Sequence, residues 1–133
     1  MSYTRVIPVE FNHCDPAGIV FYPRYFEMVN SVVETFFADV LGASFAQIHV
    51  VDGCGVPTAR ISATFHAPSR LGDRVAFSLG VRKVGRASAD FRIAGTMGDE
   101  ARLTVDLTIV WIDQCGKASP WPQALRMALE GAA

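Results

Sequence analysis

The 133-residue sequence predicts an α+β domain in which an antiparallel β-sheet is wrapped around one long central α-helix. Two observations support this prediction: an apolar pattern of helical period after Pro23, and a change to period two after residue 58. The turns between the later segments are too short for crossover helices, so neighbouring strands should be antiparallel. Half of the residues are hydrophobic, and the chain is too short for two cores, so we expect one domain over residues 1–133.

The long helix is expected from Pro23 to Leu41. Apolar side chains recur there at helical spacing, at Phe26, Val29, Val33, Phe36, Phe37 and Val40. Pro23 suits the first helical position, and Gly42 is a natural C-terminal stop. The apolar stripe is wider than contact with one neighbouring helix requires, so a surrounding sheet would bury it better. Asn30 lies on this apolar side, where a buried structural hydrogen bond is the expected role.

Five strands are expected around the helix. The first is Val6–Phe11, in which Pro8 is tolerated only at an edge or a bulge. A meander of four strands follows, near residues 59–66, 75–82, 89–97 and 102–111, each with one buried face. In the last of them Arg102 falls on the polar side. Gln47–Val51 could be a short strand, residues 52–55 form a turn or loop, and Gln123–Leu129 predicts a terminal helix.

A carboxylate stands immediately before the long helix. Pro16 biases Asp15 toward an extended backbone, and Gly18 allows the chain to turn. The free amides around Tyr22–Tyr25 carry partial positive charge and can hold an oxyanion beside this carboxylate. That combination suits acyl transfer. Taken alone, however, an Asp before a turn and a helix is most often a solvated capping residue.

Residues 13–25 read x-C-D-P-A-G-I-V-F-Y-P-x-Y, which closely resembles the signature of the 4-hydroxybenzoyl-CoA thioesterases, members of the hotdog-fold acyl-CoA thioesterases. A weaker likeness covers nearly the whole chain and fades after Asp113. The resemblance implies a single hotdog thioesterase domain. It implies that Asp15 is the catalytic carboxylate and that the backbone N–H of Tyr22 binds the thioester oxygen. An open sheet of this size leaves exposed edges and apolar surface that a second copy can cover, so we expect at least a homodimer. The resemblance implies that the active site lies at the dimer seam and that dimers pair into a homotetramer.

The resemblance further implies an acyl-CoA substrate and residues that bind it. The acyl pocket, best suited to an aryl group, is expected to be lined by Phe21, Tyr22, Val56 and Pro57. The only basic concentration is the hairpin turn that holds Lys83, Arg86 and Ser88. Relatives bind the CoA nucleotide with basic residues and a serine in this hairpin, at the positions of Arg86 and Ser88. A merely soluble turn would explain the same cluster about as well.

The favoured function is therefore hydrolysis of an aromatic acyl-CoA, similar to 4-hydroxybenzoyl-CoA, to the free acid and CoA. Asp15 would either attack the carbonyl to give a mixed anhydride or deprotonate the attacking water, and the sequence leaves both routes open. A hydrolase for short aliphatic acyl-CoA or acyl-carrier-protein thioesters and a non-catalytic acyl-CoA-binding module are the alternatives. Glu27 is a reserve candidate, because another branch of the hotdog thioesterases uses a glutamate within this helix.

Composition and motifs argue against other classes. A formal net charge of −1 gives no broad basic field, so neither nucleic acid nor a membrane is the expected partner. The motifs of serine hydrolases, zincins, P-loop and dinucleotide-binding proteins are missing. The scattered histidines predict no metal, and no cofactor is expected beyond the CoA of the substrate. Three widely spaced cysteines and the lack of a signal peptide or long apolar run predict a cytoplasmic protein.

Overall fold

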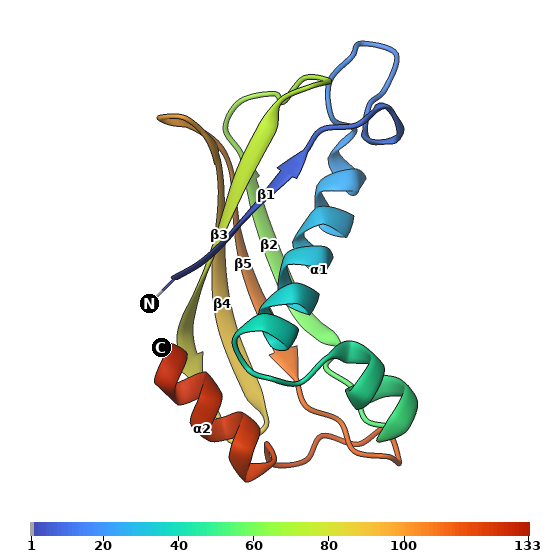
Figure 1. The fold of residues 1–133 in the computed structure, drawn as a ribbon, viewed down its shortest axis with the longest axis vertical. Helices are drawn as coiled ribbons and strands as arrows, with labels where there is room; N and C mark the ends of the chain where they lie inside the picture. The colour runs from blue at the N-terminus through green and yellow to red at the C-terminus, as the bar shows by residue number, and fades with distance from the viewer. Residues whose placement is uncertain (1) are drawn as a thin grey trace.

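The computed structural model describes residues 2–133, in which one antiparallel sheet curls around a long helix (Figure 1). The predicted α+β architecture is thereby confirmed. The elements in chain order are β1 (Ser2–Pro8), η1 (Phe11–His13), α1 (Tyr22–Asp39), η2 (Ala46–Val51), β2 (Thr58–Phe65), β3 (Arg74–Val84), β4 (Ser88–Met97), β5 (Glu100–Val110) and α2 (Gln123–Ala132). Among the described residues, no helix combines the length and hydrophobicity needed to cross a bilayer.

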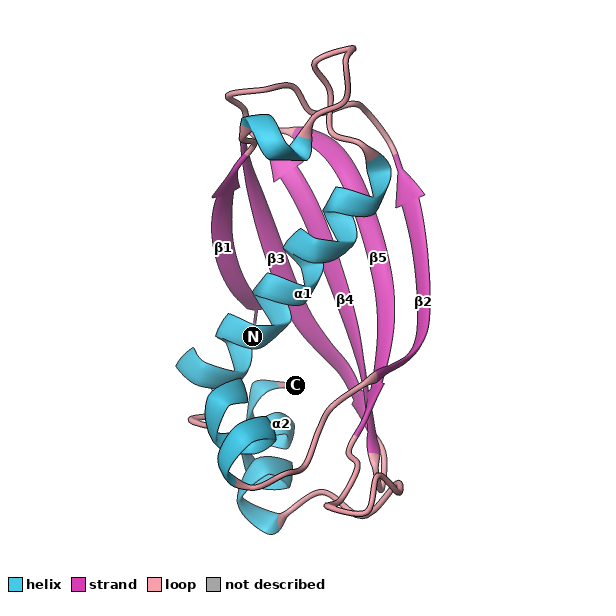
Figure 2. Ribbon diagram, turned by 90° about the vertical axis from the view of Figure 1, so that its right-hand side faces the viewer, coloured by secondary structure: helices cyan, strands magenta, loops and turns pink. Residues whose placement is uncertain are grey.

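The five strands lie in the order β1-β3-β4-β5-β2, with every neighbouring pair antiparallel (Figure 2). The predicted meander is correct for β3, β4 and β5 and wrong for β2. That strand pairs with β5, Phe65 opposite Leu103, so residues 66–73 carry the chain from the edge strand β2 past β5 and β4 to β3. The sequence signal at residues 71–73 indicates a local bend, but a bend does not specify which strand becomes the neighbour.

The hydrophobic core lies between α1 and the inner face of the sheet. Phe36 and Phe37 of α1 are fully buried, and the ring of Phe36 meets Phe91 of β4 edge-on at 5.6 Å. The predicted inward-facing residues of β3 and β5 are buried; they are Val75, Phe77, Leu79 and Val81, and Leu103, Val105, Leu107, Ile109 and the adjoining Trp111. Helix α2 packs on β3 and buries Leu125 and Leu129.

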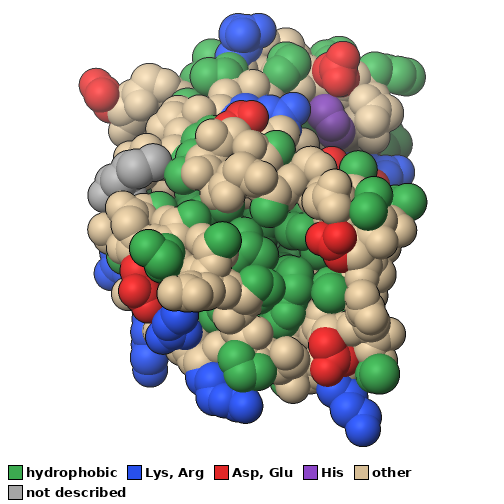
Figure 3. Space-filling model, turned by 60° about the horizontal axis from the view of Figure 1, so that its bottom comes forward, with side chains coloured by type: hydrophobic (Ala, Val, Ile, Leu, Met, Phe, Trp, Pro, Cys, Tyr) green, Lys and Arg blue, Asp and Glu red, His purple; other side chains and the backbone are tan. Residues whose placement is uncertain are grey.

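Strand β2 departs from the predicted pattern, because neither of its faces is buried. Ile61 and Phe65 remain 42% and 44% exposed. Helix α1 crosses the sheet diagonally and packs on β1 and β3, so it leaves most of β2 uncovered (Figure 2). At the end of the molecule that carries α2, hydrophobic side chains also gather at the centre of the surface, with polar and charged ones around them (Figure 3). The single chain thus keeps apolar surface in contact with water.

Two local predictions are corrected. The first strand ends at Pro8, and residues 11–13 form a 3₁₀ turn, because a proline can close an edge strand but cannot donate to a ladder. Residues 46–51 form a π-helical turn in place of the short strand considered at Gln47–Val51. The N–H of Asp52 donates to the carbonyl of Gln47 at 2.9 Å, and Ile48 alone of this turn is buried.

Candidate functional site

Asp15 lies in a short hairpin loop that leads into α1. Its N–H donates to the carbonyl of Ile19 at 3.0 Å, and its carbonyl accepts from Gly18 at 2.9 Å. Gly18 turns the chain with a φ of +77°, a backbone conformation that residues other than glycine rarely adopt. The Asp15 Oδ1 accepts from the N–H of Ala17 at 2.9 Å, while Oδ2 accepts no hydrogen bond from residues 2–133. The half-buried carboxylate borders a hollow of about 380 Å³ whose other lining residues are Phe11, Cys14, Pro16, Gly18 and Leu71.

Helix α1 begins at Tyr22, one residue earlier than predicted, and Pro23 takes the second position. The preceding Phe21 is extended, and its N–H donates to the carbonyl of His13 at 3.0 Å. The N–H of Arg24 is already used in the first turn, since it donates to the Phe21 carbonyl at 2.8 Å. The N–H of Tyr22 meets no backbone carbonyl within residues 2–133, which leaves it able to bind a ligand oxygen.

A second hollow, of about 330 Å³, lies beside this helix start. Phe65, at the end of β2, stacks on Tyr25 at 5.6 Å and meets the edge of Tyr22 at 6.3 Å. The side chain of Tyr22 is 58% exposed and lines this hollow, whereas Asp15 lines the other one. In the single chain, Asp15 and Tyr22 therefore line different hollows.

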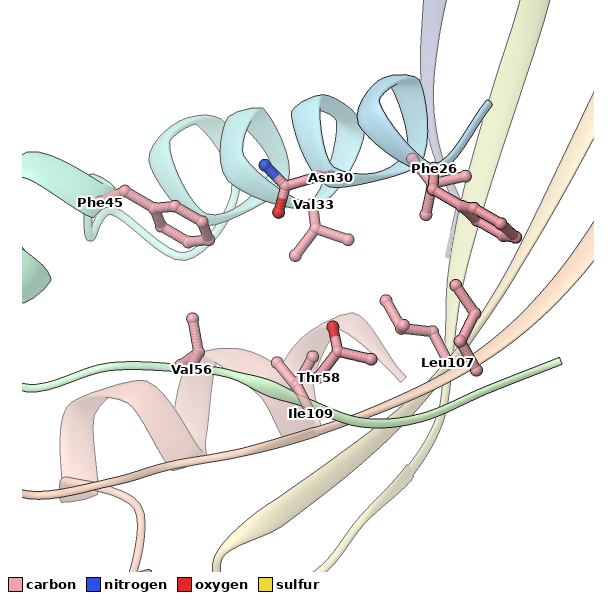
Figure 4. Close-up of a pocket in the computed structure, with 10 residues that line it drawn as sticks. Phe26, Asn30, Val33, Phe45, Val56, Thr58, Leu107 and Ile109 are labelled. Carbon is pink, nitrogen blue, oxygen red and sulfur yellow. The ribbon is translucent and has the colours of Figure 1, made fainter. Parts of the chain in front are cut away.

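A third space opens between α1 and β2, because the helix diverges from this strand after its first turns (Figure 4). The cavity measures about 270 Å³. Its walls are mainly apolar, with Phe26, Val29, Val33, Phe45, Val56, Ile61, Leu107 and Ile109. Two polar side chains also line it: Asn30 reaches in from the helix, and Thr58 faces it from the opposite wall (Figure 4). Asn30 is exposed and forms no hydrogen bond within residues 2–133, so the predicted buried structural role is wrong.

The residues predicted to form one acyl pocket are only partly brought together. Val56 is buried and lines the cavity between α1 and β2. Pro57 is exposed and does not line that cavity, because it lies just before β2, where its carbonyl accepts from the N–H of Val110 at 3.0 Å. Tyr22 lines the neighbouring aromatic hollow, and Phe21 packs edge-on against it at 5.6 Å and is 49% exposed. Asn30 and Thr58 also line this cavity, although neither is among the residues predicted for the pocket.

The predicted nucleotide-binding hairpin connects β3 and β4. Lys83 and Arg86 are exposed, and Ser88 is half-buried at the start of β4. The C-terminal segment holds this turn: the indole N–H of Trp121 donates to the Ser88 carbonyl at 3.0 Å, and the backbone N–H of the same residue donates to the Arg86 carbonyl at 3.1 Å. Arg126 Nη1 donates to the carbonyl of Gly85 at 2.7 Å. The turn is thus tied to the C-terminal segment by three hydrogen bonds, and Lys83 and Arg86 stay exposed.

One chain does not unite this hairpin with Asp15. The Asp15 loop and the β3–β4 turn lie at opposite ends of the molecule (Figure 1). Strand β3 runs between them, and its 11 residues span about 36 Å at the usual rise of a strand. A site that used both Asp15 and Arg86 would therefore have to take them from different chains.

One charged group near the Asp15 loop is not marked by the sequence pattern. Arg102 is 9% exposed, although the strand pattern puts it on the polar side. Its guanidinium lies 2.8 Å from Asp73 Oδ2. This hydrogen bond and a second one from the N–H of Arg70 hold the pKa of the Asp73 carboxyl below its ordinary value, and Asp73 in turn raises the pKa of Arg102. Periodicity could not reveal this burial, because Arg102 is covered by the loop at residues 66–73 and not by the helix.

Two further predictions concern helix α1 and metals. Glu27 is exposed and pairs with Arg24, with 2.9 Å between Nη1 and Oε1, so no contact connects it to the cavity. Within residues 2–133, no group of three histidine, cysteine, aspartate or glutamate side chains is arranged to hold a metal ion.

The antiparallel sheet wrapped around one helix, with its cavity between helix and edge strand, defines a hotdog-fold protein. The sequence matches the profile of the Thioesterase-like superfamily over residues 9–129, and the chain belongs to this superfamily. A comparison with curated protein sequences found no significant match.

Solved structures with the same fold cover nearly the whole chain. A 1,4-dihydroxy-2-naphthoyl-CoA thioesterase from Synechocystis is 20% identical, with a TM-score of 0.88 and coverage of 97% of this chain and 96% of that one. A gentisyl-coenzyme A thioesterase is 23% identical, with a TM-score of 0.85 and coverage of 94% and 98%. A hypothetical protein from Staphylococcus aureus in complex with CoA is 16% identical, with a TM-score of 0.91 and coverage of 99% and 84%. At these identities the likeness establishes the fold.

Proposed function

We propose that this protein is an acyl-CoA thioesterase that hydrolyses an aromatic acyl-CoA, of the 4-hydroxybenzoyl-CoA type, to the free acid and CoA. The observation that carries the proposal is the cavity between α1 and β2, whose apolar walls suit a flat ring and whose two polar groups suit a ring substituent. Membership of the Thioesterase-like superfamily supports the reaction class. Two similar structures are named for naphthoyl and gentisyl esters, which agrees with an aromatic acyl group.

In the proposed reaction, Asp15 supplies the carboxylate and the free N–H of Tyr22 polarises the thioester carbonyl. In one route Asp15 attacks the carbonyl carbon, forming a mixed anhydride and expelling the CoA thiolate, and water then opens the anhydride to the free acid and restores the carboxylate. In the other, Asp15 takes a proton from the water that attacks the carbonyl carbon, and the resulting tetrahedral intermediate expels the thiolate and leaves the free acid. The thiolate needs little assistance to leave, because its conjugate acid has a pKa of about 8 to 9. Rapid-quench measurements with labelled substrate separate the two routes, since only the anhydride route places label on Asp15.

The complete site is proposed to lie between two chains of a homodimer. Asp15 and Tyr22 border different hollows in one chain, and the hairpin with Arg86 lies at the far end of the molecule. Strand β2 offers an unpaired edge with exposed apolar side chains, which a second copy can cover by pairing. Pairing of such dimers into a homotetramer stays a prediction from the family resemblance.

The test of the function is a thiol-release assay with benzoyl, hydroxybenzoyl, phenylacetyl and short aliphatic CoA esters. We expect the aromatic esters to be hydrolysed with the highest kcat/KM. Preference for the aliphatic esters would replace the proposed substrate class, and absence of turnover with every ester would contradict a thioesterase that acts on CoA esters.

Asn30→Leu and Thr58→Val are expected to change substrate preference. If the two polar groups bind a ring hydroxyl, each variant should lower kcat/KM for 4-hydroxybenzoyl-CoA about 10-fold, the cost of one hydrogen bond of roughly 1.4 kcal/mol. The matched control is benzoyl-CoA, which lacks the hydroxyl and should be hydrolysed within about 3-fold of the wild-type rate. Equal losses for both esters would mean that these residues support the cavity without recognising the substituent.

Arg86→Ala is expected to raise the KM for CoA esters about 5- to 10-fold while kcat stays unchanged. The outward guanidinium would contact a CoA phosphate in both ground and transition state, so its loss weakens binding alone. Lys117→Ala is the control, since it removes one exposed positive charge from a different loop. An unchanged KM in Arg86→Ala, or an equal rise in both variants, would mean that the hairpin does not bind the CoA phosphate and is only a charged surface turn.

A further inference from the structure

The core of the described chain contains two buried polar side chains, Ser69 and Arg102. They touch each other: Nη1 of Arg102 lies 3.1 Å from the hydroxyl of Ser69. A buried guanidinium is costly unless it is paired and hydrogen-bonded, so its retention at this place calls for a structural reason.

The guanidinium of Arg102 forms hydrogen bonds with three residues of the loop at residues 66–73. Its Nη1 donates to Asp73 Oδ2 at 2.8 Å and lies 3.2 Å from the carbonyl of Pro68. Its Nε lies 2.6 Å from the exposed carboxylate of Glu100, but forms no hydrogen bond within residues 2–133. Strand β5, which carries Arg102, lies inside the sheet between β4 and β2, so the loop is tied to a strand that is paired on both sides.

The same loop holds the backbone of the Asp15 hairpin. The N–H of Val20 donates to the carbonyl of Ser69 at 2.9 Å, and the N–H of Leu71 donates to the carbonyl of Gly18 at 3.2 Å. A β-bridge between Ile19 and Arg70 lies between these two bonds. The position of the hairpin that ends in Asp15 is therefore set by the 66–73 loop.

The loop also holds the first turn of α1. The hydroxyl of Tyr25 donates to Ser69 Oγ at 2.8 Å, and Tyr25 is 4% exposed. Ser69 thus binds the end of the Asp15 hairpin through its carbonyl and the helix start through its side chain, while Arg102 holds Ser69 in place. The buried contacts from Arg102 to Ser69 and from Ser69 to Tyr25 and Val20 thus connect β5 to the first turn of α1, which contains Tyr22, and to the hairpin that contains Asp15.

We infer that Arg102 is a positioning residue: it fixes the 66–73 loop, and through this loop it sets the Asp15 carboxylate relative to the free amide of Tyr22. This role rests on the proposed function. Removing the guanidinium takes one donor each from the Asp73 carboxylate, the Ser69 hydroxyl and the Pro68 carbonyl. Because a displacement of about 1 Å in a reacting group can cost 10²-fold in rate, a loosened loop should act on kcat.

The test compares Arg102→Gln with Arg92→Gln. Arg92 pairs with Asp106 across β4 and β5, with Nε–Oδ1 of 2.9 Å, but this pair is exposed and far from the loop. We expect Arg102→Gln to lower kcat about 50- to 100-fold with KM within about 2-fold, and Arg92→Gln to keep both within about 2-fold. Activity is normalised to the folded fraction. A kcat that stays within about 3-fold in folded Arg102→Gln, or a loss confined to KM, would overturn the inference.

A second measurement does not depend on turnover. Hydrogen exchange at the amides of Val20 and Leu71 reports directly on the two bonds between the loop and the hairpin. Exchange at both should be at least about 10-fold faster in Arg102→Gln than in the wild type, and unchanged in Arg92→Gln. If the wild type hydrolyses no thioester, the proposed function fails, while hydrogen exchange still tests whether Arg102 fixes the 66–73 loop. If exchange is unchanged in Arg102→Gln, Arg102 does not fix this loop, whatever the activity.

A milder variant is decisive if Arg102→Gln does not fold. Tyr25→Phe removes the hydroxyl that donates to Ser69. Tyr3→Phe is its matched control, because the Tyr3 hydroxyl donates to Asp39 Oδ2, with 2.7 Å between the oxygens, and neither residue belongs to the site. We expect Tyr25→Phe to lower kcat about 5- to 10-fold without a change in KM, and Tyr3→Phe to leave kcat within about 2-fold. Equal effects of the two variants, or none, would overturn the positioning role.

Discussion

Replacing Asp15 by asparagine is expected to lower kcat by about 10³-fold or more, because the amide can neither attack the thioester nor accept a proton from water. The local fold should survive. The Oδ1 of the asparagine can still accept the hydrogen bond from the N–H of Ala17, which is the contact that holds the side chain against the loop. Thiol release gives kcat, and calorimetric titration with free CoA should show wild-type affinity.

Asp113→Asn is the matched control for this substitution. Asp113 also closes its own loop, where Oδ1 accepts from the N–H groups of Cys115 and Lys117 at 2.9 and 3.1 Å. The control removes the same charge from the same kind of turn, yet its kcat should stay within about 2-fold of the wild type. Near-normal turnover in Asp15→Asn would reject Asp15 as the catalytic carboxylate and leave it as a capping residue.

Ile61→Glu is expected to separate the chains and to lower kcat/KM more than about 100-fold. Ile61 is 42% exposed on the edge strand β2 and lines the cavity, so a carboxylate there places charge in the proposed seam. The chain itself should remain folded, since the side chain is already half in water. Light scattering coupled to gel filtration measures the mass, and circular dichroism measures the fold.

Val6→Glu tests whether the effect belongs to β2. Val6 is 44% exposed on β1, the other edge strand, so it matches Ile61 in exposure and in strand position. We expect Val6→Glu to keep the wild-type mass and activity. Dissociation by Val6→Glu in place of Ile61→Glu would move the seam to β1, and a wild-type chain that is active as a monomer would exclude a site shared between chains.

Much of the fold could be predicted because its signals are local. The apolar period of α1 and the alternation in β3 and β5 follow from burial against one another, and both are confirmed. The pairing of β2 with β5 is not local, because the residues of β2 have the same alternation whichever strand lies beside them. The exposure of Ile61 and Phe65 could not be predicted either, because the sequence pattern shows which residues are apolar but not which element covers them.

The candidate site divides in the same way. The Asp15 turn and the start of α1 at Tyr22 depend on residues that are neighbours in sequence. Pro16, Gly18 and Pro23 therefore predict both to within one position. The cavity is formed by elements distant in sequence, so the places of Asn30 and Thr58 could not be read from their neighbours. The burial of Arg102 could not be predicted for the same reason. Its partners lie in a loop about 30 residues earlier, and the path of that loop depends on the pairing of β2 with β5.

The strand order also determines when the cavity can come into existence during folding. Strand β2 pairs with β5 alone, so it stays unpaired until β5 has formed, and this pairing is one of two in the sheet, with β1–β3, that join strands distant in sequence. The wall that carries Thr58 and Ile61 is therefore secured only after β5 is in place. Maturation of the ligand cavity and exposure of a free strand edge to a second copy belong to the same late step, at which aggregation and correct assembly compete for one surface.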